Sequence, residues 1–535
     1  MELLRKYTSH FPRISSLYDS QQKAIENLLN EKNTLAIIPT GGGKSLIYQL
    51  TSLELLGVTL VVSPLLALMQ EQVNELRSNG VDAIALNSNM SFDEQRELLR
   101  NFKKLRIKLI YLSPERLQNG LFRASLLASE IKISMLVIDE AHCISQWGQG
   151  FRPDYDQILP FIKFLKSSKN NPVVLALTAT LSKRARKDIV KEFGILERNV
   201  IRPDSILRKN LISKFKKVSN EKEKVKQLES FLREKKPKKS LAYLYSKREC
   251  ESYACAFSVL GFKTEYFHAA LEPEEKDRVY SEFLEGKIEL LFATTAFGMG
   301  INIPDIDSVV HIQIPNSVEE YYQHIGRGGR DATRCPECFC LALWSEVNFK
   351  KRKGIILSDK FTEEMLERSF KQLSLYNKAG KIVSKDKEDY LAASDNLHLV
   401  KYYFEREGVL KTIGEINGSP LKIILKKNTV LWDKILKAAG GIDSFIHASN
   451  HSGIKIEGII KHLYEQEFSG NIEKLPARSR QLFFKSNYNT LPKKTVNKII
   501  REANMFVDFR VNQLEELHEL FSHSKPNDYI KKILN

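Results

Sequence analysis

A glycine-rich loop directly after an apolar run is the feature that most constrains this chain. The run Leu35–Ile38 is β-type, and Thr40-Gly41-Gly42-Gly43-Lys44-Ser45 comes directly after it. Backbone N–H groups of such a loop can surround a phosphate, the lysine can reach the β- and γ-phosphates, and the serine hydroxyl can ligate Mg²⁺. The strict phosphate-loop pattern has glycine at position 38, where this chain has Ile38, so the loop alone does not establish a nucleotide site.

A pair of carboxylates at the end of a second apolar run supplies the other half of that chemistry. The run Ile133–Ile138 ends in Asp139-Glu140-Ala141-His142. We expect Asp139 to hold a metal ion through water and Glu140 to polarise the attacking water. Together the loop and the acidic pair predict hydrolysis of a nucleoside triphosphate.

Composition limits the class of protein. A chain of 535 residues is expected to form three or four domains. The 82 Lys and Arg against 65 Asp and Glu leave a net charge of +17, which favours a polyanionic partner. No stretch approaches the ~20 apolar residues that span a bilayer, so no membrane association is expected. The six cysteines are too few for a disulfide scaffold, and a reduced, cytoplasmic setting is predicted.

Apolar runs alternate with helical stretches in two successive blocks, which predicts two doubly wound α/β domains with parallel sheets. In the first block the runs end in polar signatures that include Ser63-Pro64, Ser113-Pro114-Glu115-Arg116 and Thr178-Ala179-Thr180. Ligands of open α/β sheets bind at the carboxyl ends of the strands, so these signatures are expected to share one surface. The runs are Leu35–Ile38, Leu60–Val62, Leu109–Leu112, Met135–Ile138 and Val173–Leu177, then Leu241–Tyr245, Glu265–Phe267, Leu290–Ala293 and Val309–Ile312.

The second block comes after a polar, Lys-rich stretch at about 210–239 and has no phosphate loop. Two of its runs end in Ser246-Lys247 and Thr294-Thr295, and it closes with the segment Gln323–Asp331. Arg327 and Arg330 are three residues apart, so a helix would present both on one face. Arginines supplied across a cleft stabilise charge on a transferred phosphoryl group.

These motifs resemble those of the RecQ family of 3′-to-5′ DNA helicases within helicase superfamily two. The resemblance covers about Leu17 to Asp331 and is most specific in the aromatic-rich segment Ala141–Tyr155, with further support from Val61–Met69 and Ala296–Asn302. It implies two RecA-like domains that bind ATP and Mg²⁺ between them. It also implies 3′-to-5′ movement on single-stranded DNA and unwinding of duplex DNA in repair or recombination, at the nucleoid if the source is bacterial.

The expected site residues are drawn from the motifs and the resemblance. The catalytic set is Lys44, Asp139, Glu140, Arg327 and Arg330, the metal ligands are Ser45 and Asp139, and the remaining nucleotide contacts are Gln21, which reads adenine, Thr40, Gly41, Gly42, Gly43 and Gln323. The expected DNA contacts are Ser63, Arg116, Trp147, Phe151, Arg152, Ser246, Lys247 and Thr294. Trp147 and Phe151 can each stack an unpaired base at ~1–3 kcal/mol without sequence preference.

The chain departs from the family pattern in three motifs. Tyr18 stands where the family has an arginine beside the adenine, with Ile14 where an aromatic often lies, and Gln149-Gly150 replaces an acidic neighbourhood in the aromatic loop. Only Cys335, Cys338 and Cys340 are available where the family has a four-cysteine zinc subdomain. Free cysteines on a strand are favoured over a three-cysteine site completed by a distant histidine, so zinc is not expected.

The C-terminal region is the fourth departure. Here His398–Glu407 predicts an amphipathic helix, and Thr412–Ile416 and Leu421–Leu425 flank Asn417-Gly418-Ser419-Pro420, a hairpin signal. Helices before a two-stranded wing predict a winged helix, the family's duplex-binding module, with an unrelated α+β domain as the alternative. The expected domains are 1–207 (ATP-binding), 208–345 (second RecA-like), 346–435 (probable winged helix) and 436–535 (helical accessory).

Two other functions compete with the DNA helicase. One is an RNA-directed DEAH-type remodelling ATPase, which the aromatic loop disfavours. The other is a non-enzymatic DNA-binding scaffold. A retired ATP site would be expected to have lost at least one of Lys44, Glu140 and Arg330, and all three are present.

Overall fold

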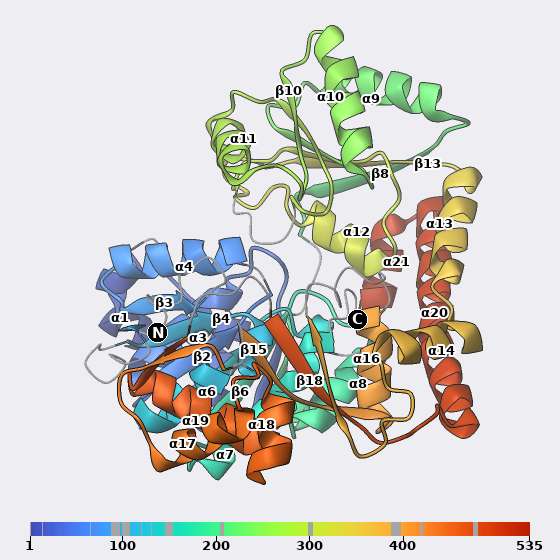
Figure 1. Ribbon diagram of the computed structural model, residues 1–535. Coiled ribbons are helices and arrows are strands. Elements are labelled where there is room, and N and C mark those ends of the chain that lie inside the picture. Colours follow the sequence, from blue (N-terminus) through green and yellow to red (C-terminus); the bar gives the residue numbers. More distant parts are fainter. Residues whose placement is uncertain are drawn as a thin grey trace.

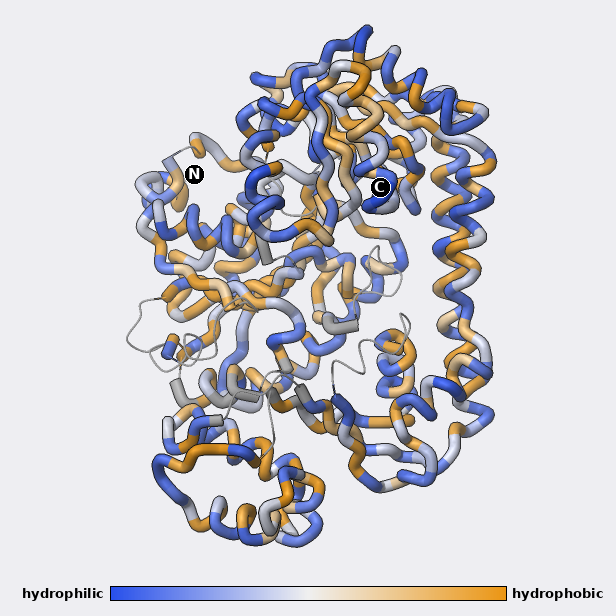
Figure 2. Tube along the Cα trace, turned by 45° about the horizontal axis from the view of Figure 1, so that its top comes forward, coloured by the Kyte–Doolittle hydropathy of each residue, from blue (hydrophilic) through white to orange (hydrophobic). Residues whose placement is uncertain are grey.

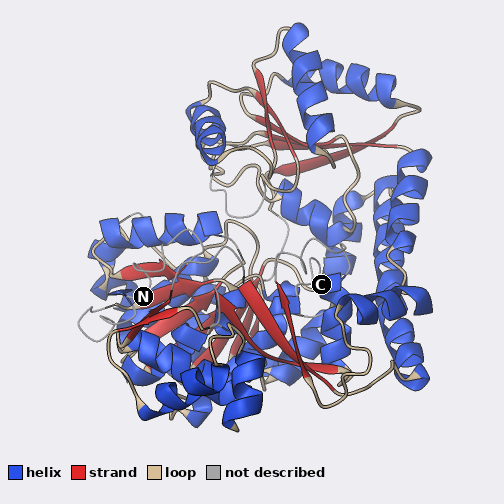
Figure 3. Cartoon of the chain, viewed as in Figure 1, coloured by secondary structure: helices blue, strands red, loops and turns tan. Residues whose placement is uncertain are grey.

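The computed structural model describes the chain in segments: residues 2–12, 14–64, 66–86, 97–98, 107–118, 120–129, 131–144, 153–203, 208–297, 303–386, 397–417, 421–474 and 480–534. Two strand-rich bodies and a mainly helical accessory region make up this part (Figures 1 and 3). Among the described residues, no helix is both long enough and apolar enough to span a membrane.

The first body is a seven-stranded parallel sheet with the order β3-β4-β2-β5-β6-β1-β7. Nearly every strand residue is buried, as expected for a parallel sheet covered on both faces. The strands are β1 Thr34–Ile37, β2 Val58–Val62, β3 Ala83–Leu86, β4 Leu109–Leu112, β5 Ile133–Ile138, β6 Val173–Thr178 and β7 Val200–Ile201. The helices are α1 Glu2–Lys6, α2 Asp19–Leu29, α3 Lys44–Glu54, α4 Leu66–Ser78, α6 Gly120–Ser129, α7 Ile158–Ser167 and α8 Lys183–Glu192, with short 3₁₀ turns that include η2 Pro114–Gln118, η3 Ala141–Cys143 and η4 Pro153–Gln157.

The second body is a six-stranded parallel sheet with the order β10-β11-β9-β12-β13-β8. The strands are β8 Leu211–Lys217, β9 Ser240–Tyr243, β10 Thr264–Phe267, β11 Leu290–Ala293, β12 Ser308–His311 and β13 Cys338–Trp344. The helices are α9 Glu221–Lys235, α10 Lys247–Val259, α11 Pro273–Glu285 and α12 Val318–Ile325. The two parallel sheets confirm the predicted tandem α/β architecture.

One strand lies where the sequence predicts a polar separator. Strand β8 falls within the Lys-rich stretch at about 210–239 and forms the edge of the second sheet next to β13. Exposed lysines alternate along it with more buried residues. An edge strand has one solvated side and can therefore be rich in lysine, so its composition resembles that of a connection between domains.

The accessory region contains a three-stranded antiparallel sheet with the order β14-β18-β15. These strands are β14 Ile382–Asp386, β15 Leu410–Asn417 and β18 Arg480–Ser486, and the neighbouring helices are α13 Glu346–Ser358, α14 Glu363–Gln372 and α16 Leu397–Arg406. Helix α16 confirms the predicted amphipathic helix. A small antiparallel sheet beside helices is what a winged helix requires, but that assignment and the four domain boundaries remain predictions.

The predicted hairpin at 412–425 is wrong. Strand β15 pairs with β18, and the short strand β16 Ile423–Leu425 pairs with β17 Ile472–Lys474, so the two expected partners do not pair with each other. The described residues between β15 and β18 contain three helices, α17 Val430–Ala439, α18 Phe445–Ser452 and α19 Ile456–Phe468. We refer to residues 421–474 as the insert.

The insert packs on the first body. Helix α19 contacts α6, and Trp432, Ile459 and Leu463 belong to the same hydrophobic core as Phe122 and Phe161 of the first body. In Figure 1 the insert helices lie against the blue and cyan domain.

The longest helix, α20 Lys493–Ser522, joins the accessory sheet to the second body. Its early residues Val496 and Ile499 belong to the accessory core, whereas Leu514 and Leu517 belong to the core of the second body. Hydrophobic and hydrophilic patches alternate along its length in Figure 2. The last helix, α21 Pro526–Leu534, packs on the same body.

Candidate nucleotide-binding cleft

The glycine-rich loop leaves β1 and enters α3, so Lys44 and Ser45 occupy the first turn of that helix. The first N–H groups of a helix have no partner within it and carry partial positive charge, which suits a phosphate. Lys44 donates to the carbonyl of Ile38 at 3.3 Å. Burial lowers the pKa of Lys44, and the nearby carboxylates of Glu140 and Asp139 raise it.

Gln21, expected to read adenine, supports the loop instead in this structure. Its side chain is buried, and its Nε2 donates to the carbonyls of Gly42 and Gly43 at 3.1 and 3.2 Å. Its Oε1 accepts the Tyr18 N–H at 2.8 Å. Both ends of the amide are therefore occupied by backbone, and adenine recognition stays a prediction. The Tyr18 ring is 68% exposed, so it is accessible for stacking.

The acidic pair lies at the end of β5, beside the end of β2. The Ser63 hydroxyl donates to Asp139 Oδ2 at 3.4 Å, and the Glu140 N–H donates to Asp139 Oδ1 at 3.0 Å. Burial and the neighbouring Glu140 raise the pKa of Asp139 to about 7. A buried carboxylate whose charge is poorly compensated is suited to a cation. Ser63 is itself buried against Asp139, and its expected DNA contact stays a prediction.

A chain of polar contacts runs from Glu140 to the second body. His142 Nδ1 lies 3.3 Å from Glu140 Oε2 and 3.0 Å from the Thr178 hydroxyl, which donates to the Thr180 carbonyl at 2.7 Å. Gln323 on α12 then donates to the Thr180 hydroxyl at 3.1 Å. The strand-end signature at Thr178–Thr180 was identified from the sequence, but its contacts to His142 and Gln323 were not, because they join three separate segments.

The arginine-bearing segment after α12 lies against the glycine-rich loop. A Cβ atom at Gly326 would fall 2.1 Å from the Thr40 hydroxyl, so only glycine permits this approach. A Cβ at Gly41 would lie 3.8 Å from Cγ of Arg330. Arg327 is buried, and burial together with the charges of Arg327 and Arg208 lowers the pKa of Arg330 to about 9, which leaves it charged at neutral pH. The structure thus brings the five expected catalytic residues together, since the charges of Asp139, Glu140, Arg327 and Arg330 all act on Lys44.

Apart from Ser63, the expected DNA contacts fall into three groups. Ser246 and Lys247 are exposed at the start of α10, and Thr294 comes directly after β11, so these three lie at carboxyl ends of strands in the second sheet. Arg116 is half-buried in η2. The aromatic-loop residues Trp147, Phe151 and Arg152 lie outside the described residues. Directly after that loop, the Tyr155 hydroxyl donates to the Asp139 carbonyl at 3.0 Å, so the chain leaving the loop is tied to the acidic pair.

Three cysteines of the second body lie on or near its strand β13. Cys338 and Cys340 lie on β13 with Cys335 just before it, and all three are buried and free. A hydrogen bond with Cys338 and burial raise the pKa of Cys335. Among the described residues, no group of three or more His, Cys, Asp or Glu is placed to hold a metal. Whether the protein lacks zinc stays a prediction.

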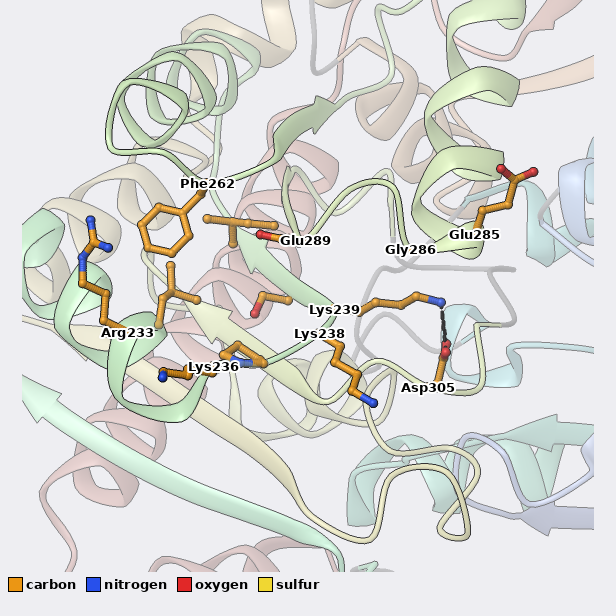
Figure 4. Close-up of a pocket in the computed structure, with 13 residues that line it drawn as sticks. Arg233, Lys236, Lys238, Lys239, Phe262, Glu285, Gly286, Glu289 and Asp305 are labelled. Atoms are coloured by element: carbon orange, nitrogen blue, oxygen red, sulfur yellow. Dashed lines mark hydrogen bonds and ion pairs between the residues drawn. The ribbon is translucent and has the colours of Figure 1, made fainter.

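A separate pocket of about 760 Å³ lies at the amino ends of β9 and β11 (Figure 4). Its lining includes Phe262, Lys236 and Lys238, and Lys239 pairs with Asp305 at 2.9 Å. Ligands of α/β sheets bind at the opposite, carboxyl ends, so this pocket is distinct from the nucleotide cleft.

Comparisons with known proteins find helicases. Residues 18–189 match the family model described as DEAD/DEAH box helicase, and residues 223–332 match the helicase conserved C-terminal domain. The chain is 34% identical over 366 residues to the probable ATP-dependent DNA helicase RecS of Bacillus subtilis, a match that covers 68% of this chain and 71% of that one. It is 38% identical over 321 residues to the ATP-dependent DNA helicase RecQ of Pasteurella multocida, covering 59% and 48%. The match therefore spans about half the length of that relative.

Among solved structures, the DUF1998 helicase MrfA bound to DNA matches with a TM-score of 0.55 and 17% identity, covering 77% of this chain and 61% of that one. At this identity the match supports the fold alone.

Proposed function

The chain belongs to the RecQ family of DNA helicases, and from this premise we propose that it couples ATP hydrolysis to movement along single-stranded DNA. The proposed direction is 3′ to 5′, and the proposed outcome is unwinding of duplex DNA during repair or recombination in the cytoplasm. Its net charge of +17 suits a protein that tracks a phosphate backbone.

The observation that carries the proposal is the contact between the two bodies at the nucleotide cleft. Lys44 belongs to the first body, whereas Arg327 and Arg330 belong to the second, and Gly326 approaches Thr40 closely. A triphosphate held by Lys44 would therefore meet guanidinium groups only when the bodies are together. Hydrolysis and cleft closure become linked events, which is what a translocating motor needs.

The chemistry is assigned to residues of the cleft. Lys44 binds the β- and γ-phosphates, Glu140 orients the attacking water and takes its proton, and the two arginines stabilise charge on the transferred group. The oxygen donors of Asp139 and Ser45 suit Mg²⁺, and the raised pKa of Asp139 indicates a carboxylate in need of a cation. That ion would neutralise phosphate charge. No role is assigned to zinc.

The DNA path is assigned to the surface formed by the carboxyl ends of the strands. Exposed Ser246 and Lys247, with Thr294 nearby, are proposed to contact the backbone, along with Ser63 and Arg116 on the first body. Trp147, Phe151 and Arg152 are proposed to stack on bases and to report DNA binding to the acidic pair, for which the Tyr155–Asp139 hydrogen bond offers a short route.

Unwinding of tailed duplexes tests the proposal most directly. Wild-type protein should unwind a duplex with a 3′ single-stranded tail in an ATP-dependent manner and leave a 5′-tailed duplex intact, and Lys44→Ala should unwind neither. ATPase stimulation should be larger with single-stranded DNA than with RNA of the same length. Preferential unwinding of the 5′ tail, or stronger stimulation by RNA, would contradict the assignment.

A further inference from the structure

We infer that Arg208 is a positioning residue that holds the arginine-bearing segment of the second body in register with the nucleotide cleft. The inference rests on the proposed function and concerns a residue that no motif identifies. Arg208 lies in the connection between β7 and β8, three residues before β8 begins.

One guanidinium group binds three backbone carbonyls of that segment. Arg208 Nη1 donates to Gly329 O at 2.8 Å, and Nη2 donates to Gly326 O at 2.8 Å and Gly328 O at 2.9 Å. Asn210, two residues later, donates to the same Gly329 oxygen at 2.8 Å. The connection between the two bodies therefore grips the segment that carries Arg327 and Arg330.

The bound carbonyls are ones that the local structure leaves without helix partners. Helix α12 ends at Ile325, and the last carbonyls of a helix have no intrahelical donor. A positive charge near this end also interacts favourably with the helix dipole. Arg208 meets both needs with a planar group that a lysine cannot reproduce.

The segment is also packed closely against the residues that it contacts besides Arg208. A Cβ atom at Gly328 would lie 2.3 Å from Cys338 Sγ, and Gly326 already approaches the Thr40 hydroxyl. The segment is thus packed between the phosphate loop, strand β13 and Arg208. Loss of Arg208 would remove three of the hydrogen bonds that hold the segment in this position.

This placement affects catalysis through the two arginines. A displacement of about 1 Å at a catalytic group can lower the rate roughly 100-fold. The charges of Arg208 and Arg327 both act on Arg330, so the three guanidinium groups lie within electrostatic reach of one another. Arg208 itself donates all its observed hydrogen bonds to backbone, which makes it a support for the catalytic groups.

The test compares Arg208→Ala with Lys209→Ala, which removes an equal charge from the exposed neighbouring position. Arg208→Ala should lower kcat of DNA-stimulated ATP hydrolysis about 10- to 100-fold with a much smaller change in KM for ATP, since the phosphate loop is intact. Arg208→Lys should retain part of kcat. Lys209→Ala should match wild type, and thermal unfolding should confirm that all variants fold. Equal kcat for the two alanine variants would overturn the inference.

A double variant separates positioning from an independent role. In an Arg330→Lys background, Arg208→Ala should lower kcat by a smaller factor than in wild type, because both changes act on the same group. Losses that multiply in full would show that Arg208 acts elsewhere.

Hydrogen exchange keeps this test distinct from that of the proposed function. The Gly329 N–H donates to the Ile306 carbonyl at 2.7 Å and the Asp331 N–H to the Pro304 carbonyl at 3.0 Å. Arg208→Ala should speed exchange in a peptide covering residues 326–331, and Lys209→Ala should not. Unchanged exchange would refute the inference even if the enzyme is active. Absence of ATPase activity in wild type would instead refute the proposed function.

Discussion

The two RecA-like bodies share one strand order but differ in the residues that leave the end of each strand. The order β3-β4-β2-β5-β6-β1 of the first sheet corresponds strand for strand to β10-β11-β9-β12-β13-β8 of the second. Strand β1 leads into the phosphate loop, whereas its counterpart β8 leads through Val218-Ser219-Asn220 into α9. Strand β5 leads into Asp139-Glu140, whereas its counterpart β12 leads into Ile312-Gln313. The scaffold is common to both bodies, and the chemistry lies in the residues after the strands.

The two bodies also differ in the side chains that lie at the ends of their central strands. In the second body, buried His311 and His324 lie 3.1 Å apart between ring nitrogens, and Tyr243 stacks on His324 with ring centroids 4.2 Å apart. In the first body, the residues that follow the counterpart strand β5 are the carboxylates Asp139 and Glu140. The packed rings of the second body support α12, the helix that precedes Arg327 and Arg330. The carboxylates of the first body are instead suited to a cation beside phosphate.

The largest expected effect comes from the first body's strand ends. Lys44→Ala and Glu140→Gln should each lower DNA-stimulated ATP hydrolysis by at least about 100-fold, and Glu140→Gln should still bind ATP. The matched control is Lys222→Ala at the exposed start of α9, the counterpart of α3, and it should be active. Steady-state ATPase assays and fluorescent-nucleotide binding measure both. Near-normal turnover of either cleft variant would break the comparison.

The second prediction concerns the loop after β5, which has no counterpart after β12. Trp147→Ala with Phe151→Ala should leave basal ATPase activity unchanged and abolish its stimulation by single-stranded DNA. Unwinding should fall further than DNA affinity, since backbone contacts supply most of the salt-dependent binding. If the rings are core residues, each change should instead destabilise the protein by ~3–5 kcal/mol in a thermal scan. A stable variant with full stimulation would exclude a coupling role.

The third prediction tests the packing of the insert on the first body. Trp432 is fully buried in the insert, so Trp432→Ala should destabilise that unit by ~3–5 kcal/mol while basal ATPase activity persists. Val430→Ala changes an exposed position of the same helix and should be neutral. Chemical denaturation and limited proteolysis would detect the effect. Loss of basal activity on Trp432→Ala would show that the insert supports the cleft itself.

A smaller effect is expected from pH. Burial, with Arg327 nearby, lowers the pKa of His324 to about 3, and burial lowers that of His311. Because both pKa values are lowered from the unfolded value of 6.5, the stability that the neutral rings provide is present above pH 6.5 and is lost as pH falls below it, for His324 down to about pH 3. His311→Gln should reduce the slope of unfolding free energy against pH in this window by up to about 1.4 kcal/mol per pH unit.

Urea unfolding at several pH values between 5 and 7 measures that slope. An unchanged slope in His311→Gln would mean that burial does not keep His311 neutral in the folded protein.

The smallest effect is expected from a zinc chelator, because we predict that the second body holds no zinc. Treatment with a zinc chelator should change neither the unfolding temperature nor ATPase activity measured after Mg²⁺ is restored. Elemental analysis should find no stoichiometric zinc. One equivalent of tightly bound zinc would direct attention to Cys335, Cys338 and Cys340.

The sequence predicted the cleft well because each of its motifs is local. A phosphate loop or an acidic pair is a short segment after an apolar strand, and sheet topology brings such segments together. Arg208 could not be found in this way, since a single arginine in a Lys-rich stretch carries no signal without its three distant carbonyl partners. Gln21 was found by motif, but a motif does not say that the amide also supports the loop.

The accessory region was predicted less well because its pairing is non-local. Asn417–Pro420 resembles a hairpin turn, but the chain makes a long excursion through the insert before β18 returns to β15. Strand β8 was missed because an edge strand with alternating lysines resembles a linker.

Helix α20 gives the molecule a lever. With 30 residues it is about 45 Å long, so a tilt of about 5° at one end displaces the other by roughly 4 Å. One end is packed into the second body and the other into the accessory sheet, while the insert grips the first body. A rotation of the second body that tilted α20 by this angle would therefore displace the accessory-sheet end of the helix by several ångströms.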